Sequence, residues 1–486
     1  MALFKNLFFN YLLSISSLLI PLMIFPYLTR VLDEDALGTY LWVDSITQYF
    51  IVLASFGIPY YGVREIAKAK EDADKVASLT FDLILLHIVF TLIACICYGI
   101  SAVVNEELNS HFYFVRLGLL TLLFSVFLIE WLFQGLSRFK YITVRTLTIK
   151  ALSLLLIYSF VRNSDDVRVY AVVTMLSVFL NAAVNISFFY RSYPIAFSIS
   201  FERLKVHLRP LLVFFSINVS ISVYTLLDSV FLGFLDSPGH LSLYAMPLKL
   251  VKIYWTVLNS ATLVFLPKIT KLGEEGNLVK MSDLLSKSMN IVILGSLPFI
   301  LICNVFPEWI LTTFFGKGYG KSADVLRLLS LLPLIIGICN VFSVQFLVAI
   351  HKEKLVLYAT VVGLLISVVF NFLLIPRFSI LGCAITTCLS ELAVMGMMYL
   401  SSARFLFLKP ESRLFWSMAL AFAGTLLCHY FLSSLELSTL FELPIILSIY
   451  GTIAMASAVF IFRSAFVIEI IKLVSSYVRR YINSTV

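Results

Sequence analysis

The feature that most constrains this chain is a succession of long apolar runs separated by short polar segments. Many of these runs reach eighteen residues or more, the length that a helix needs to cross the hydrocarbon core of a bilayer. Hydrophobic residues make up 60% of the chain and charged residues 13%, whereas soluble domains carry about 25% charged residues. The sequence therefore predicts an all-α integral membrane protein.

The apolar runs predict about 14 transmembrane helices. Their approximate ranges are 8–28, 39–59, 80–103, 113–133, 143–161, 169–190, 210–234, 242–266, 288–306, 325–350, 355–375, 379–402, 414–432 and 443–463. The first run follows Lys5 but has no small-residue cleavage site after it. We therefore interpret it as a retained helix and not as a signal peptide.

No motif in the sequence indicates a catalytic or metal centre. A Gly-rich phosphate loop, a CxxC pair and an HExxH motif are all absent, so no catalytic residue, metal ion or cofactor is predicted. The seven cysteines lie within apolar runs, at Cys95, Cys97, Cys303, Cys339, Cys383, Cys388 and Cys428. Such cysteines are typical packing residues. The net charge of +8 is spread over short loops, which argues against a nucleic-acid partner.

The distribution of Lys and Arg predicts the orientation. If the N-terminus is cytoplasmic, most basic residues fall in inner segments, whereas the outer loops carry only Arg30, Arg162, Arg168, Lys317, Lys321 and Arg377. By the positive-inside rule, the number of spans is even and both termini are cytoplasmic.

Two parts of the chain resemble each other in the same order. Leu37 and Tyr40 match Leu241 and Tyr244 after a polar turn, at an offset of 204 residues. "QGLSRFKYITV" (134–144) matches "VAIHKEKLVLY" (348–358) at an offset of 214. Six helices return the chain to the side on which it began, so the two copies form a parallel repeat with a pseudo-two-fold axis along the membrane normal. Such repeats are typical of transporters, with the substrate site between the halves.

The repeat predicts the domain organisation. Residues 1–190 form an N-lobe of six helices, 191–209 a cytoplasmic linker, 210–402 a C-lobe of six helices, and 403–463 two further helices. Residues 464–486 alternate apolar and basic residues at helical spacing, as in an amphipathic helix on the inner membrane surface. Contact with anionic lipids explains such basic faces.

Several segments resemble a known family of membrane proteins. These are "YLTRVLDEDALGTY" (27–40), "FGIPYYGVREIAKAKED" (56–72), "YTLLDSVFLGFL" (224–235), "LVFLPKITKL" (263–272) and "LLIPRFSILGCAITTCLSE" (373–391). They are similar to the polysaccharide transporters that include the bacterial Wzx-type O-antigen flippases, in the superfamily of MATE drug antiporters and MurJ-type lipid flippases.

The resemblance implies an inner-membrane protein with two six-helix lobes around a central cavity, and two extra C-terminal helices. It implies that the cargo is an oligosaccharide linked to undecaprenyl diphosphate. The protein would move this cargo from the inner to the outer leaflet by alternating access. Membrane lipids and the polysaccharide polymerase or chain-length machinery are the implied partners.

Charged residues inside predicted spans are candidate functional residues, because a charge at the bilayer centre costs about 2.5–3.5 kcal/mol on insertion scales. The candidates are Asp44, Asp82, Glu130, Lys150, Asp228, Lys249, Lys252 and Glu391. Asp82 lies so close to its helix start that we expect it to contact water.

Residues equidistant from a hairpin turn lie at the same depth in the membrane. This geometry places Asp228 opposite Lys249, and Glu130 opposite Arg145, so these charges can neutralise each other structurally. Lys252 and Lys150 do not fall into such symmetric pairs. Each either pairs with an acid on a distant helix or lines the cavity, where a low-dielectric wall strengthens attraction for a diphosphate.

We accordingly assign substrate binding in a cationic cavity to Lys252, Lys150 and Lys249. A second group has either an ion-coupling or a pairing role and comprises Asp44, Asp228, Glu391 and Glu130.

Two other functions are compatible with a polytopic membrane protein. A MATE-like multidrug or organic-cation antiporter would need acidic cavity residues, whereas this chain also has intramembrane lysines. A membrane glycosyl-transfer enzyme would need a large external loop with catalytic groups. The longest outer connection, 307–324, has no His and only Glu308 and Asp324 as acids, so no enzyme activity is predicted.

Overall fold

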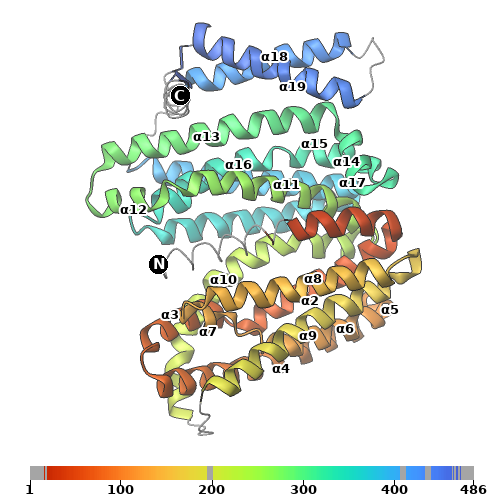
Figure 1. Ribbon diagram of the computed structural model, residues 1–486, viewed down its shortest axis with the longest axis vertical. Coiled ribbons are helices and arrows are strands. Elements are labelled where there is room, and N and C mark those ends of the chain that lie inside the picture. Colours follow the sequence, from red (N-terminus) through yellow and green to blue (C-terminus); the bar gives the residue numbers. More distant parts are fainter. Residues whose placement is uncertain are drawn as a thin grey trace, which may run out of the picture. The chain divides into compact units, whose positions relative to one another are not determined.

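The computed structural model describes residues 16, 19–193, 201–405, 412–432, 439–461, 463–464, 467–468 and 471. Within these ranges the regular structure is helical and contains no β-strand (Figure 1). The predicted all-α class is confirmed. Most of the predicted amphipathic tail lies outside the described residues, and so do residues 194–200 of the predicted linker.

The chain divides into two compact units. Unit 1 contains Met1–Met246 and Ser367–Cys383, and unit 2 contains Pro247–Ile366 and Ala384–Val486. Residues 201–246 and 367–383 thus group with the N-terminal helices. The division into two six-helix lobes, drawn from the sequence repeat, stays a prediction.

Long helices lie side by side in unit 1 (Figure 1). In chain order, the long and short α-helices of this unit up to residue 235 are α2 (Glu34–Ser55), α3 (Ile58–Ala69), α4 (Ala73–Val104), α5 (Glu106–Ser110), α6 (Phe112–Ser125), α7 (Glu130–Gly135), α8 (Phe139–Phe160), α9 (Val167–Ser192) and α10 (Phe201–Leu235). Asp33 caps α2 by accepting hydrogen bonds from the amides of Asp35 and Ala36, which satisfies donors that the first turn leaves unpaired.

Unit 2 contains most of α11 (Leu241–Leu263), together with shorter and longer helices that follow it. These are α12 (Leu266–Glu274), α13 (Leu278–Val305), α14 (Pro307–Phe315), α15 (Ala323–Leu329), α16 (Leu332–Asn340), the π-helical segment η3 (Val341–Leu347), α18 (Ser412–Leu432) and α19 (Thr439–Ala456). The long helix α17 (Glu353–Ser402) passes through both units.

Nine helices of the described chain are long and apolar enough to cross a membrane, or up to eleven if two bent pairs each count as one span. α17 has 50 residues and a non-helical Ser379 (φ 51°, ψ −130°) inside it. At 1.5 Å per residue it would be about 75 Å long, far more than the ~30 Å of one crossing. We therefore interpret α17 as two spans that meet at Ser379. The total of fourteen stays a prediction.

The structure gives the sequence repeat a backbone counterpart. Ser137 (φ 56°) and His351 (φ 58°) both adopt the left-handed conformation, and they are 214 residues apart. A hydrogen bond of 2.8 Å closes each turn. The amide of Arg138 donates to the carbonyl of Phe133 across Ser137, and the amide of Lys352 donates to the carbonyl of Leu347 across His351. This is the hydrogen bond of a Schellman-type helix end. The two turns that matched in sequence share one local geometry.

The second helix of each half is also followed by a bend. α2 and α3 meet at 41°, and α11 and α12 meet at 47°. α3 carries Lys68 and α12 carries Lys271 in its last turn, so each half has a short amphipathic helix after a bent apolar one. The bends occur at corresponding places and agree with the parallel repeat predicted from the sequence.

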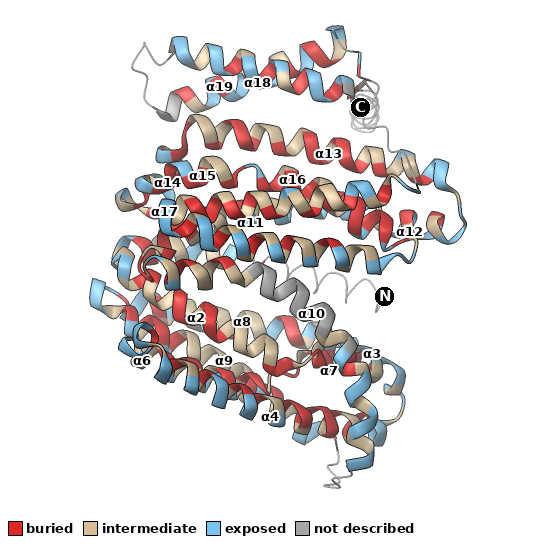
Figure 2. Cartoon of the chain, turned by 180° about the vertical axis from the view of Figure 1, so that it is seen from behind, coloured by how far each residue is buried: buried red, intermediate tan, exposed pale blue. Residues whose placement is uncertain are grey.

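Apolar side chains cover the outer surfaces of the helices as well as the interior. Ile96, Ile100 and Val103 of α4 are all exposed, and Figure 2 shows exposed and buried segments alternating along this helix. Ile66 of α3 and Leu132 of α7 belong to a buried cluster in unit 1. Exposed apolar helix faces of this length are expected where lipid replaces water as the solvent.

Candidate functional site

A buried ion pair joins α7 and α8 in unit 1. The guanidinium of Arg145 donates to Glu130 Oε1 at 2.6 Å, and it also contacts the side-chain oxygen of Asn185 on α9. The side chain of Arg145 is only 3% exposed, whereas that of Glu130 is 43% exposed. The pairing predicted from hairpin depth is confirmed. Asn185 was missed, because it lies on the next helix and not in the hairpin.

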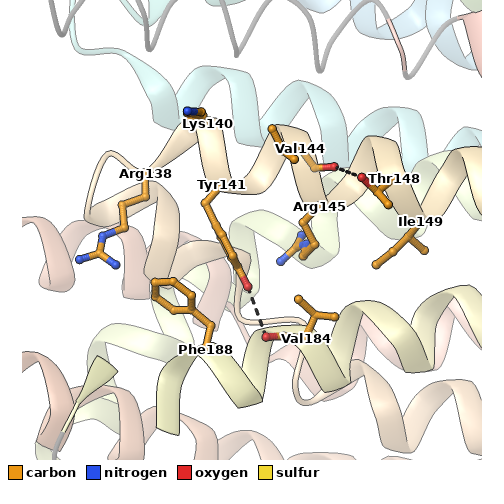
Figure 3. A pocket seen from close by; sticks show the side chains of 9 residues that line it. All are labelled: Arg138, Lys140, Tyr141, Val144, Arg145, Thr148, Ile149, Val184 and Phe188. Atoms are coloured by element: carbon orange, nitrogen blue, oxygen red, sulfur yellow. Dashed lines mark hydrogen bonds between the residues drawn. The ribbon is translucent and has the colours of Figure 1, made fainter. Parts of the chain in front are cut away.

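A pocket of about 660 Å³ lies beside this ion pair, between α8 and α9 (Figure 3). Arg138 and Lys140 lie at one end, with the Arg138 guanidinium 5.3 Å from the centre of the Phe188 ring. Tyr141 donates a hydrogen bond to the carbonyl of Val184 at 3.3 Å (Figure 3). The remaining lining residues are Val144, Arg145, Thr148 and Ile149. The site combines a cationic end with a largely apolar wall.

Lys150 follows this pocket along α8 and is partly buried. It makes no direct ion pair with any residue that the structure describes, but the carboxylate of Glu130 lies within its electrostatic range. Glu130 therefore faces two cations, of which Arg145 is in direct contact. The substrate-binding role assigned to Lys150 stays a prediction.

Asp44 lies on α2 within a network of hydroxyl groups. Gln48 donates to its carboxylate at 3.5 Å, and the phenols of Tyr40, Tyr98 and Tyr170 lie within its electrostatic range. A hydrogen bond of 2.7 Å joins Tyr40 to Thr174 on α9. The sequence singled out Asp44, but not these neighbours, of which Tyr98 comes from α4, and Tyr170 and Thr174 from α9.

Asp228 is buried on α10. Its Oδ1 accepts hydrogen bonds from Ser367 at 2.9 Å and from Asn371 at 2.7 Å, both on α17. These donors were not predicted, because hairpin geometry relates only helices that follow each other in the chain. Two polar residues four positions apart in the apolar run 355–375 were the available signal, since such residues share one helix face. The pairing of Asp228 with Lys249 stays a prediction.

The other candidate residues belong to unit 2. Lys249 is partly exposed and Lys252 is exposed on α11, whereas Glu391 is partly exposed on α17. Glu391 lies within electrostatic range of the Cys339 thiol. The central cavity that these residues were expected to line stays a prediction.

One expectation was wrong. Asp82 was expected to contact water, but its side chain is only 5% exposed and lies 3.4 Å from a guanidinium nitrogen of Arg203 on α10. The position near a helix start did not indicate burial, because α10 packs over this end of α4. Asp82 and Arg203 line a second pocket of about 410 Å³, together with Lys68, Lys75 and His207.

In the loop just before α4, Asp72 accepts a hydrogen bond from the backbone amide of Lys75 at 3.1 Å and pairs with its ammonium group at 3.0 Å. These donors lower the pKa of the exposed Asp72 carboxyl. The second pocket itself is lined by charges of both signs, since Glu65 and Asp82 lie beside the cations that line it.

The fold of the chain resembles that of solved multi-helix transporters. The lipid II flippase MurJ in an inward closed conformation has a similar structure, with a TM-score of 0.68 and 14% identity over 95% of this chain and 100% of that one. A multidrug MATE transporter in an inward-facing conformation gives a TM-score of 0.58 with 13% identity, over 79% of this chain and 97% of that one. The class is thus a polytopic membrane protein with the MATE and MurJ fold.

The sequence comparison narrows this class. Residues 3–273 match the family described as "Polysaccharide biosynthesis protein", and the chain belongs to this family. A putative O-antigen transporter of Escherichia coli K12 is 24% identical over 79% of this chain and 92% of its own length. A second one, of Shigella dysenteriae, is 22% identical over 80% of this chain and 97% of its own length. A probable glycan biosynthesis flippase of Haloferax volcanii matches over 34% of this chain at 24% identity.

Proposed function

We propose that this protein is a flippase for an oligosaccharide carried on a polyprenyl diphosphate, of the O-antigen repeat-unit type. The supporting observation is the match to two putative O-antigen transporters over 92% and 97% of their lengths. A match of this extent spans most of both chains and not one shared segment. The fold likeness to MurJ is compatible with lipid-linked cargo.

The physical task of such a protein is to carry a dianionic, hydrated headgroup across hydrocarbon. Transfer of an unpaired charge into an apolar medium is strongly unfavourable, so the path needs water and compensating positive charge. We propose that Lys150, Lys249 and Lys252 supply this charge from the helices α8 and α11, in a cavity that opens to each side in turn. The chain would act in the bacterial inner membrane without catalysing a chemical step.

A strain that lacks this protein tests the proposal. We expect it to lose surface polysaccharide and to accumulate the complete lipid-linked oligosaccharide in the cytoplasmic leaflet, where enzymes added from the outside cannot reach it. Lipid extraction with mass spectrometry identifies the intermediate, and its sugars identify the cargo. A strain that lacks the polysaccharide polymerase is the matched control, because there the same intermediate should accumulate on the outer side.

Normal surface polysaccharide in the deletion strain, with no accumulated intermediate, would contradict the proposal. Complementation by the full chain should restore export. If the intermediate accumulates in the outer leaflet of the deletion strain, the protein acts in a step that follows translocation.

A MATE-like antiporter for organic cations is the second candidate, supported by the fold likeness and by the Asp44 network in unit 1. A carboxylate among hydroxyl groups is a suitable site for a proton or a cation. Increased sensitivity of the deletion strain to cationic drugs, with unchanged surface polysaccharide, would favour this function.

A further inference from the structure

The pocket between α8 and α9 has features that the transport function does not require. Its nine lining residues include three cationic side chains, Arg138, Lys140 and Arg145, and no acidic one. Arg145 is neutralised by Glu130, so Arg138 and Lys140 give this end of the pocket its net positive charge. The opposite wall is apolar and open, since Val144 and Val184 are both exposed.

Arg145 provides a second, independent observation. It is one of the most buried charged residues of the described chain, and it lines the pocket. Its Nε–H donor is buried and has no hydrogen-bond acceptor among the described residues. A buried donor without an acceptor is unfavourable, so an acceptor that reaches this nitrogen from the pocket is favoured there.

We propose that this pocket binds an anionic phospholipid of the inner leaflet. The phosphate lies at the end formed by Arg138 and Lys140, close to Arg145, and one acyl chain follows the wall formed by Val144, Ile149 and Val184. Basic pockets between membrane helices on the cytoplasmic side are typical sites for such headgroups. The turn before α8 belongs to the predicted cytoplasmic surface, where these lipids are found.

The lining chemistry favours a phospholipid over the glycan of the transported lipid. A sugar needs several free hydroxyl or amide partners, and this pocket offers only two neutral polar side chains, Tyr141 and Thr148. Both hydroxyls already donate to backbone carbonyls, of Val184 and Val144. An acyl chain needs no such partners. The inference does not depend on the proposed transport function.

Native mass spectrometry of the purified full chain tests the proposal. The probes are phosphatidylglycerol and phosphatidylcholine with identical acyl chains. We expect the wild type to prefer phosphatidylglycerol. The double variant Arg138→Gln with Lys140→Gln should reduce this preference by roughly 10- to 30-fold, because each basic residue at a membrane surface contributes roughly a fivefold preference. The control with the same change in charge is Lys68→Gln with Lys75→Gln, which lie in the second pocket and not in this one; this variant should retain the preference for phosphatidylglycerol.

A second pair of variants tests the apolar wall without changing any charge. Val184→Trp should fill the pocket and weaken phosphatidylglycerol binding, whereas Val172→Trp, at another exposed position of α9, should not. Equal losses in both charge variants, or full binding in Val184→Trp, would overturn the proposal. Stoichiometric displacement of phosphatidylglycerol by undecaprenyl diphosphate would also overturn it, and would assign the pocket to the carrier lipid.

Discussion

Burial divides the charged residues of unit 1 into two kinds. Arg145 is almost completely enclosed, while its partner Glu130 reaches the surface. Loss of one residue of the pair therefore does not have the same effect on the stability of the protein as loss of the other. Loss of Glu130 leaves a buried cation with Asn185 as its main partner, whereas loss of Arg145 leaves a carboxylate that water can still solvate.

This asymmetry predicts the outcome of two substitutions. Glu130→Gln should destabilise the protein by about 1–3 kcal/mol, below the usual range for a fully buried pair because Glu130 is partly solvated. Glu130→Gln combined with Arg145→Met should recover much of this loss, since no charge is then left buried. Thermal unfolding in detergent measures both. Equal stability of the single variant and the wild type would contradict a structural role for the pair.

Lys150 and Lys252 carry the electrostatic part of the proposed function. Replacement of both by Ala should reduce surface polysaccharide by roughly tenfold or more at unchanged protein level, because one charge-assisted contact is worth about a factor of ten in affinity. Lys252→Arg should retain export. Lys268→Ala, which removes an exposed lysine of α12, is the control. Full export with Ala at both positions would exclude a cationic path through these lysines.

At the level of residues, the sequence predicts contacts only between helices that follow each other. Glu130 and Arg145 were found in this way because one turn joins them. Asp228 with Ser367 and Asn371, and Asp82 with Arg203, were not found, because their helices are far apart in the chain. Hydropathy gives the depth of a residue in the membrane but not its direction around the helix axis.

At the level of elements, the turns that begin the fifth and eleventh predicted helices are the best evidence for a repeat. Both hold a non-glycine residue in the left-handed region, which costs L-residues roughly 1–2 kcal/mol. The sequence match at an offset of 214 identified these turns as related. It did not indicate their conformation, because neither position carries the glycine that most often adopts a positive φ.

This shared strain predicts a shared response to substitution. Ser137→Gly and His351→Gly should each stabilise the protein by about 0.5–1 kcal/mol, since glycine adopts this conformation without strain but loses more entropy on folding. Ser137→Val should destabilise it, because a β-branched side chain fits the left-handed region poorly. Thermal unfolding of the three variants provides the measurement. Destabilisation by both glycine substitutions would show that the two turns are not strained.

At the level of the whole molecule, composition and charge distribution were sufficient for the class and for a testable orientation. The multi-pass, all-α architecture follows from the length of the apolar runs alone. The grouping of residues 201–246 and 367–383 with unit 1 did not follow, because it depends on packing between distant helices. The single long helix α17 leaves one topological question, namely whether the chain reaches the outer side near Ser379.

Fusions that report the side of the membrane answer this question. Alkaline phosphatase is active only outside the cytoplasm. Green fluorescent protein does not fluoresce when it is exported in unfolded form, so its fluorescence marks a cytoplasmic position. We expect phosphatase activity for fusions after Asn163 and after Phe378, and fluorescence for fusions after Gly276, after His351 and after Arg404. The reason is that the positive-inside rule places the segments near Lys268, Lys352 and Arg404 in the cytoplasm. Fluorescence after Phe378 would mean that α17 does not cross the membrane twice, and the predicted total of about 14 spans would then be wrong.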